Sequence, residues 1–221
     1  MALNRIQLRK LLKILFLDPN ARRGEIRADI RDEISHETGT SSSGPDFYGP
    51  FWSDAKRHVF GVADLHALVE DRIEANDRRA NLYPQLRDGF LAWWNVRRRW
   101  TNEPFMPGPS VSGTVDFPDL NATVKVDNVL CVIDGTGERH VIYPYFSPSP
   151  ELSAESARLG IWLLSIALPN VPFEEIRILD MIRGITFSVD RYPLQGNEET
   201  EFVRRYAAAL DERAILRREY P

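Results

Sequence analysis

The fold of this chain depends most on residues 121–168, NATVKVDNVLCVIDGTGERHVIYPYFSPSPELSAESARLGIWLLSIAL. Its first part is dense in valine, leucine and isoleucine, which favour a buried β-strand. Gly135 and Gly137 supply the backbone freedom that a tight reversal needs. RHVIYPYF, which begins at Arg139, continues with a second apolar run. The sequence therefore predicts two neighbouring strands joined by a glycine turn, on which the downstream elements pack.

A helix is predicted directly after these strands. Ser153 is suited to cap its N-terminus, and Glu155 lies in the first turn, where a carboxylate interacts favourably with the helix dipole. A helix that is apolar nearly all round is a buried one, so we expect Trp162 to be enclosed on all sides. The apolar positions are Leu159, Ile161, Trp162, Leu163, Leu164, Ile166 and Leu168.

A second hairpin and a final helix complete the chain. EEIRILDMI predicts a strand, and Arg183-Gly184 can turn it into ITFSVDRY. The last helix is predicted to begin after Asn197 as N-cap, with glutamates in its first turn and arginines in its last turn. Its predicted inner face consists of Val203, Tyr206, Ala207, Leu210 and Ala214.

The N-terminal third is predicted to be mainly helical. Residues 1–35 show helical spacing of apolar residues and predict a helical hairpin. Its two helices are expected to pack on the main body, which is the more common outcome, or to present a face to a partner. Residues 36–53 are rich in glycine, serine and proline and predict a loop or linker. Residues 54–100 are predicted to form a helical layer, in which the helical spacing of apolar residues begins at Val62. Residues 101–118 contain four prolines and are predicted to cross from this layer to the sheet.

This order of elements predicts an α+β fold, with mixed α/β character. We expect a central mixed β-sheet of about four to five strands flanked by helices, together with a helical N-terminal region. The predicted division is residues 1–35, 36–53 and 54–221, with a single domain overall as the alternative.

Composition narrows the functional classes. The chain has 221 residues, 43% of them hydrophobic, and a net charge of -4, which gives no general attraction to nucleic acid or anionic membranes. Cys131 is the only cysteine, which excludes an internal disulfide and a cysteine-rich zinc site. KLLKILFL near the N-terminus is interrupted by lysines and is typical of an amphipathic helix rather than a signal peptide. We expect a soluble, cytoplasmic protein without a membrane partner.

The run WWNVRRRW, residues 93–100, is the strongest nucleic-acid signal. It places Arg97, Arg98 and Arg99 beside Trp94 and Trp100, and guanidinium groups can bind phosphates while indoles stack on bases. The alternative is a helix C-terminus whose arginines complement the dipole and whose tryptophans lie in the core.

Known catalytic motifs do not occur in the sequence. There is no GxSxG, GxxxxGK[ST], HExxH or GxGxxG pattern. Asp64 and His66 lie in a stretch with other potential metal ligands, but residues two apart on a helix point to different sides. We therefore predict no metal site there and no cofactor.

One resemblance emerges from the order of elements over about residues 62–190. A helix, VDNVLCV, a glycine turn, HVIYPYF, a buried helix and another strand resemble the core of the restriction-endonuclease-like PD-(D/E)XK nucleases, especially their RecB-like branch. In that family, an aspartate and an acidic-x-lysine set hold Mg²⁺, a hard cation that prefers oxygen ligands.

The resemblance implies a degenerate active site. Asp127 would be the first aspartate, and Glu70 or Asp71 would be the acidic residue of the preceding helix. The acidic-x-lysine set would fall on Tyr143 and Tyr145, which cannot replace a carboxylate and an ammonium group. The glutamine often found on the next helix is also absent from SARLGIW. We therefore expect no tight Mg²⁺ site at Asp127.

Two functions follow as hypotheses. The first is a non-catalytic protein of nuclease-like fold that binds a protein partner or nucleic acid, within a larger assembly. For a protein partner, the predicted surface is the N-terminal face of Leu8, Leu11, Leu12 and Leu15. The alternative is a metal-dependent nuclease or other hydrolase, which would need Mg²⁺ and carboxylates such as Asp116, Asp119, Asp127 and Asp134.

Overall fold

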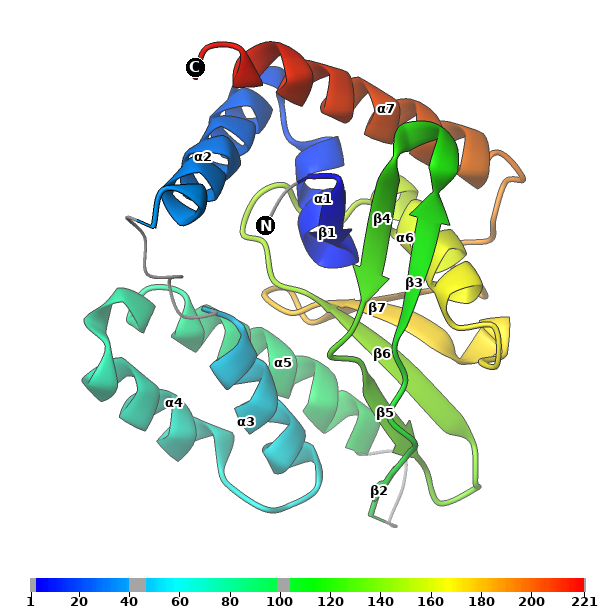
Figure 1. Cartoon of the computed structure of the whole chain (residues 1–221). Helices are drawn as coiled ribbons and strands as arrows, with labels where there is room; N and C mark the ends of the chain where they lie inside the picture. The colour runs from blue at the N-terminus through cyan, green and yellow to red at the C-terminus, as the bar shows by residue number, and fades with distance from the viewer. Residues whose placement is uncertain (1–2, 40–46, 99–103, 221) are drawn as a thin grey trace.

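The computed structural model describes residues 3–39, 47–98 and 104–220 (Figure 1). Its fold is mixed α and β, with a five-stranded mixed sheet flanked by helices, as the sequence predicts. The helices are α1 (Leu8–Phe16), α2 (Pro19–Glu37), α3 (Gly49–Val59), α4 (Leu65–Ala75), α5 (Tyr83–Arg98), α6 (Ala154–Ala167) and α7 (Glu198–Arg217). The strands are β1 (Arg5–Gln7), β2 (Met106–Pro107), β3 (Gly113–Phe117), β4 (Ala122–Val126), β5 (Leu130–Ile133), β6 (Arg139–Tyr145), β7 (Ile176–Asp180) and β8 (Ile185–Ser188).

The strands form two sheets. The larger sheet has the order β2-β5-β6-β7-β8, and the smaller one has the order β1-β4-β3. In the larger sheet β6 and β7 are parallel, from Val141 opposite Ile176 to Tyr145 opposite Asp180, and α6 connects them. The other strand pairs in this sheet are antiparallel. The predicted β6-α6-β7 order and the β7-β8 hairpin are confirmed.

The larger sheet separates two hydrophobic cores. Side chains alternate along its strands, so β5, β6 and β7 each contribute to both cores. The core under α3, α4 and α5 includes Leu130, Val132, Ile142, Leu179 and Met181. The core shared with α1, α2, α6, α7 and the smaller sheet includes Cys131, Val141, Tyr143, Tyr145, Ile176 and Ile178. Figure 1 shows α3, α4 and α5 grouped at one end of the molecule and α2 and α7 at the other.

The sequence predicts one strand before the glycine turn at Gly135, but the structure has two strands there, β4 and β5, so this prediction was wrong. β4 pairs in the smaller sheet, whereas β5 pairs in the larger one. The chain bends between them at Asn128, whose φ of 57° lies in the left-handed region. The indole N–H of Trp52 donates a hydrogen bond to the Asn128 carbonyl and holds this bend.

The N-terminal apolar face is not free to bind a partner. Residues Arg5–Gln7 form β1, which pairs in parallel with β4, and the helix begins only at Leu8. Leu8, Leu11, Leu12 and Leu15 are all buried in the chain's own core. Of the two outcomes expected for the N-terminal helices, packing on the main body is confirmed, and the alternative of a partner surface on this face is contradicted.

Helix positions in the first half of the chain also differ from the prediction. α3 begins inside the predicted linker, because Pro50 is tolerated in the first turn of a helix. β2, which includes Pro107, and β3, which lies between Pro109 and Pro118, form within the predicted crossing segment. Val62, expected in a buried helical face, is 65% exposed and precedes α4.

The two C-terminal helices are confirmed, with different buried faces. Trp162 of α6 is only half-buried and packs against Phe202 at 5.4 Å between ring centroids, while Ile166 is exposed. α6 is therefore not enclosed on all sides, although Ser153 caps it as predicted. In α7, the buried side chains are Glu198, Phe202, Tyr206, Ala209 and Leu216, so only Tyr206 of the predicted face is fully buried.

The start of α7 is stabilised differently from the prediction. Asn197 makes no side-chain capping bond. Instead, the carboxylate of Glu198 accepts hydrogen bonds from the backbone N–H groups of Gln195 and Gly196, at 2.7 and 2.9 Å. A carboxylate in the first turn also interacts favourably with the helix dipole.

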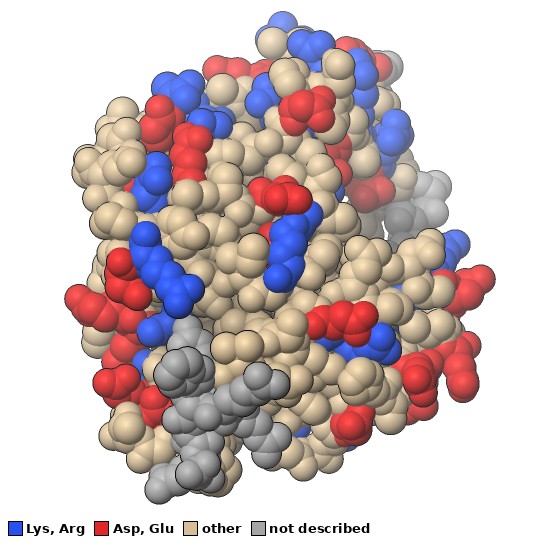
Figure 2. All heavy atoms as spheres, turned by 180° about the vertical axis from the view of Figure 1, so that it is seen from behind, with Lys and Arg blue, Asp and Glu red and all other residues tan. Residues whose placement is uncertain are grey.

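The surface carries mixed charge. Seen from the side opposite to Figure 1, basic and acidic side chains are interspersed around a wide uncharged area (Figure 2). None of the helices in the described part of the chain is both long and apolar enough to cross a bilayer.

The contact between α5 and the β7-β8 turn gives a stability prediction. A Cβ on Gly89 would lie 2.2 Å from the Met181 carbonyl oxygen, which is backbone and cannot move aside cheaply. Gly89→Ala should therefore lower the free energy of unfolding in urea by about 1–3 kcal/mol. Gly24→Ala is the matched control, because nothing lies within 4 Å of that position on α2.

In the control, alanine should stabilise the helix by about 0.5–1 kcal/mol. Equal unfolding midpoints for the two variants would contradict the packing of α5 against this turn.

Candidate functional site

A pocket of about 1030 Å³ opens at one end of the larger sheet. The C-terminal part of α5 forms one wall, and the β5-β6 hairpin and the β7-β8 region form the others. Its lining on the sheet includes Val132, His140, Ile142, Arg177 and Thr186. These positions are neighbours, because Val132 pairs with His140 and Ile142 pairs with Arg177. The pocket therefore lies over the end of the sheet that faces α5.

Part of the pocket's exposed edge, called the rim below, is apolar. Val96 of α5 is 54% exposed and Ile185 of β8 is 47% exposed, and both line the pocket. Phe105 is half-buried beside them, and the next residue, Met106, is exposed. An exposed apolar rim around a concave site is typical of a ligand-binding surface.

Two tryptophans form the inner wall. Trp93 and Trp94 are buried, and their indole N–H groups have no hydrogen-bond partner within the described part of the chain. The ring of Trp94 stacks on Phe90 and lies 4.9 Å from Phe105 between ring centroids. In this arrangement, Trp94 belongs to the core, and its faces are not open for stacking on a base.

The other predicted nucleic-acid-binding residues can be located only in part. Arg97 and Arg98 lie at the C-terminal end of α5, next to the pocket-lining Val96, and their side chains are not described. Arg99 and Trp100 lie outside the described residues. Nucleic-acid binding by this run therefore stays a prediction.

Asp134 organises the acidic side of the pocket. Its Oδ1 accepts hydrogen bonds from the Thr136 N–H at 2.9 Å, the Thr136 hydroxyl at 2.6 Å and the Glu138 N–H at 3.0 Å. Its Oδ2 lies 2.8 Å from Nε2 of His140. Desolvation has the largest single effect on this carboxyl and raises its pKa, but the hydrogen bonds from Thr136, His140 and Glu138 outweigh it and lower the pKa to about 2.

These residues also form a group with metal-ligand chemistry. Asp134, Glu138 and His140 each offer one potential ligand atom, and these three atoms lie within 4.8 Å of one another. No other group of three such residues occurs among residues 3–39, 47–98 and 104–220. Sequence reasoning predicted the turn and named Asp134 among the carboxylates of a possible metal centre, but it did not place Glu138 and His140 beside it. The available signal was the D-x₃-E-x-H spacing, which a two-stranded hairpin brings together across its turn.

Arginines line the same pocket, and sequence reasoning missed them as well. Arg177 is half-buried on β7, and its Nη1 donates to the carbonyl of Glu175 at 3.0 Å. Burial lowers the pKa of the Arg177 guanidinium, against the opposing effect of carboxylates such as Asp190. Arg191 is exposed, and its side chain makes no hydrogen bond or ion pair within the described structure.

Asp127 lies at the bend between β4 and β5, away from the pocket lining. Its carboxylate accepts hydrogen bonds from Gln7 at 2.9 Å and Asn128 at 3.2 Å, and Arg9 lies 3.5 Å away. Burial lowers the pKa of nearby Lys56, while the charge of Asp127 acts in the opposite direction. The expected lack of tight Mg²⁺ binding at Asp127 stays a prediction, and this arrangement supports it.

The two tyrosines at the acidic-x-lysine position are structural. The hydroxyl of Tyr143 accepts a hydrogen bond from the Arg9 N–H at 3.0 Å, and burial raises the pKa of Tyr143 to about 12. The hydroxyl of Tyr145 donates to the carbonyl of Pro150 at 2.8 Å. Both side chains are almost completely buried, so neither has access to a solvent-exposed substrate.

The remaining predicted carboxylates are dispersed. Glu70 and Asp71 are exposed on α4. Asp116 accepts a hydrogen bond from the Thr123 hydroxyl at 2.6 Å, and Asp119 lies in the short turn of 3₁₀-helix after β3. Within the described part of the chain, none of these residues belongs to a group of three potential metal ligands.

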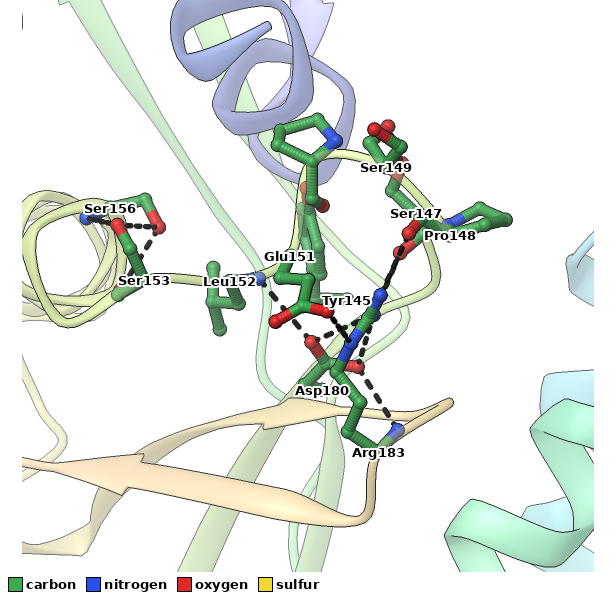
Figure 3. A network of polar contacts seen from close by, with 11 residues as sticks. Tyr145, Ser147, Pro148, Ser149, Glu151, Leu152, Ser153, Ser156, Asp180 and Arg183 are labelled. Carbon is green, nitrogen blue, oxygen red and sulfur yellow. Dashed lines mark hydrogen bonds and ion pairs between the residues drawn. The ribbon is translucent and has the colours of Figure 1, made fainter.

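The carboxyl ends of the parallel strands β6 and β7 are closed by the chain itself (Figure 3). Asp180 is buried there, and its carboxylate pairs with Arg183 at 3.2 Å and accepts from the Leu152 N–H at 3.3 Å. Arg183 also donates to the carbonyl of Pro148 at 2.7 Å. Ligands often bind at this end of parallel strands, but here the network fixes the connection from β6 to α6.

Comparison of the chain with protein-family models, with curated proteins and with solved structures finds no match. The nuclease-like resemblance stays a prediction from the order of elements. The pocket and the residues that line it are therefore the basis of the function proposed below.

The hydrogen bonds to Asp134 predict a pH-dependent contribution to stability. Because its folded-state pKa of about 2 lies below the ordinary value of 3.8, the charged carboxylate stabilises the fold above pH ~4, and this contribution is lost as the pH falls towards 2. Thr136→Val removes one donor and should raise the pKa of Asp134. In urea, this variant should be less stable than the wild type at about pH 6, and the difference should shrink between about pH 4 and 2.

Direct titration provides the check, because the carboxyl carbon of Asp134 can be followed by NMR. A carboxyl that titrates near 3.8 in both proteins would contradict the network.

Proposed function

We propose that this protein acts by binding single-stranded nucleic acid in the pocket between α5 and the end of the larger sheet. In this proposal, Arg177 and Arg191 hold a phosphate, and the adjoining base lies against the apolar rim. The protein would then be a non-catalytic binder of nuclease-like fold. The observation that supports it is one concave surface that combines arginines with an exposed apolar rim.

The position of the arginines supports phosphate recognition. The half-buried guanidinium of Arg177 lies where solvent screening is reduced, so its attraction to an anion is stronger than on an open surface. Arg191 has no side-chain partner within the described structure, so it can bind a phosphate without first breaking an ion pair. Arginine is well suited to this task, because its planar donors match phosphate oxygens.

The rim supports contact with a base. Phe105 is half-buried, and Val96 and Ile185 expose apolar surface beside it. Every base has an apolar face, so such contacts are tolerant of sequence. Arg97, Arg98 and Arg99 follow Val96 directly in the chain, which would extend a positive path for the backbone of the strand.

The competing functions make different demands. A protein partner would use the apolar rim and would depend little on salt. A metal-dependent hydrolase built from Asp116, Asp119, Asp127 and Asp134 is not supported by their positions, because only Asp134 belongs to a group of potential metal ligands within the described residues. The rim of the pocket replaces the buried N-terminal face as the place to look for a protein partner.

Substitution of Arg191 tests the proposal. Arg191→Ala should weaken binding of a short labelled oligonucleotide by about tenfold, because a hydrogen bond to a charged group contributes on the order of 1.5–3 kcal/mol. It should also flatten the plot of log affinity against log salt by about 0.7, the effect of one lost phosphate contact on a single strand. Replacement of Arg97, Arg98 and Arg99 together should flatten the plot further. Fluorescence anisotropy at several salt concentrations measures both effects.

Arg78→Ala is the matched control. Arg78 is exposed on the 3₁₀-helix η1 (Asp77–Arg79), does not line the pocket, and should change neither affinity nor slope. Equal losses in Arg78→Ala and Arg191→Ala would show general charge attraction and sink the proposal. A wild-type protein that binds neither single- nor double-stranded nucleic acid at low salt would do the same and favour the protein partner.

A further inference from the structure

We propose that Asp134, Glu138 and His140 form a binding site for a divalent metal ion of the zinc type at the acidic side of the pocket. This site goes beyond nucleic-acid binding and does not depend on it. Two carboxylates and one imidazole are established zinc ligands, and three protein ligands leave a fourth position for water or a bound anion. The three residues lie on one hairpin, at the end of β5, in the turn and on β6.

The positions of the ligand atoms fit this chemistry. A tetrahedral ion with bonds of about 2.0–2.2 Å places its ligand atoms roughly 3.3–3.6 Å apart. The potential ligand atoms of the three residues already lie within 4.8 Å of one another. Oδ2 of Asp134 and Nε2 of His140 are 2.8 Å apart, within hydrogen-bond distance of each other, and a metal between them would replace this hydrogen bond. Small side-chain rotations therefore complete the site.

The rest of the hairpin holds the ligands in place. The second oxygen of Asp134 accepts three hydrogen bonds from Thr136 and Glu138, which fixes the orientation of the carboxylate. Such outer contacts are usual around metal-binding carboxylates. The side chain of Glu138 makes no hydrogen bond or ion pair in the described structure, so it can turn to the metal at the cost only of its charge attraction to Arg177.

A separate feature of the pocket points to a ligand. Trp93 lines it and is 7% exposed, and its indole N–H has no acceptor among the described residues. A buried donor without an acceptor costs free energy. That indole nitrogen is itself shielded from solvent, so water carried by a metal, or an anion bound to it, would supply the acceptor after a small movement of the Trp93 ring. The orphaned donor is independent of the hydrogen bonds within the hairpin.

The ligand set also selects the metal. Mg²⁺ prefers oxygen ligands and keeps several waters, whereas Zn²⁺ readily accepts the imidazole nitrogen of His140. A bound ion would place positive charge opposite Arg177 and Arg191. The pocket would then attract an anionic ligand from both sides.

Calorimetry of the full chain, stripped of metal, with zinc chloride and magnesium chloride tests the site. We expect one zinc ion per chain and no saturable magnesium binding. Glu138→Gln should weaken zinc binding by at least about tenfold, and His140→Asn should abolish it. Glu70→Gln and His66→Asn are the matched controls, because both residues are exposed on α4 and outside the pocket. In NMR spectra of the four histidines, zinc should shift the ring of His140 alone.

Three results would overturn the proposal. These are a lack of saturable zinc binding by the wild type, equal zinc affinity in Glu138→Gln and Glu70→Gln, and zinc-induced shifts at a histidine other than His140. The variants remain informative because the Glu138 side chain makes no hydrogen bond or ion pair in the described structure whose loss would unfold the hairpin. The probe is the metal alone, so failure here leaves nucleic-acid binding untouched, and failure of nucleic-acid binding leaves this test valid.

Discussion

The parallel pairing of β6 with β7 is the constraint on which the rest of the structure depends. Both strands are buried on their two faces, and a parallel pair requires a crossover, which α6 supplies. The sheet must therefore be covered on both sides. Helices α3, α4 and α5, which precede it in the chain, cover one face, and α6, the smaller sheet and the terminal helices cover the other. The network of Asp180 and Arg183 then closes the carboxyl end of the pair.

The candidate site lies where the helices stop covering the larger sheet. A pocket remains at the end of α5, over the start of β6 and β7, and its lining combines an apolar rim with charged groups of both signs. The hairpin places carboxylates and an imidazole on one side, and β7 and the segment after β8 supply the arginines. Such a separation of charge suits an anionic ligand at the arginines and a cation at the hairpin, and one pocket can hold both.

The sequence predicts elements that depend on local signals. Ser153 caps α6 as its position indicates, and Gly137 takes a positive φ of 84° in the predicted turn. The division of the central stretch between two sheets could not be predicted, because the valines look alike on both sides of Asn128. The bend depends on Trp52, which lies 76 residues away in the chain. The site needed the same non-local information, since Arg177 and Asp134 come together only in the folded sheet.

We propose that single-stranded nucleic acid is bound at the open end of the larger sheet. Hydrogen–deuterium exchange with and without a saturating short oligonucleotide tests it most directly, because it reports on every backbone amide at once. If the oligonucleotide binds in the pocket, backbone amides in the β5-β6 hairpin, in β8 and at the C-terminal end of α5 should exchange more slowly. Slower exchange confined to α2 and α7, which border a different hollow lined by Arg22, Arg23 and Arg27, would contradict it.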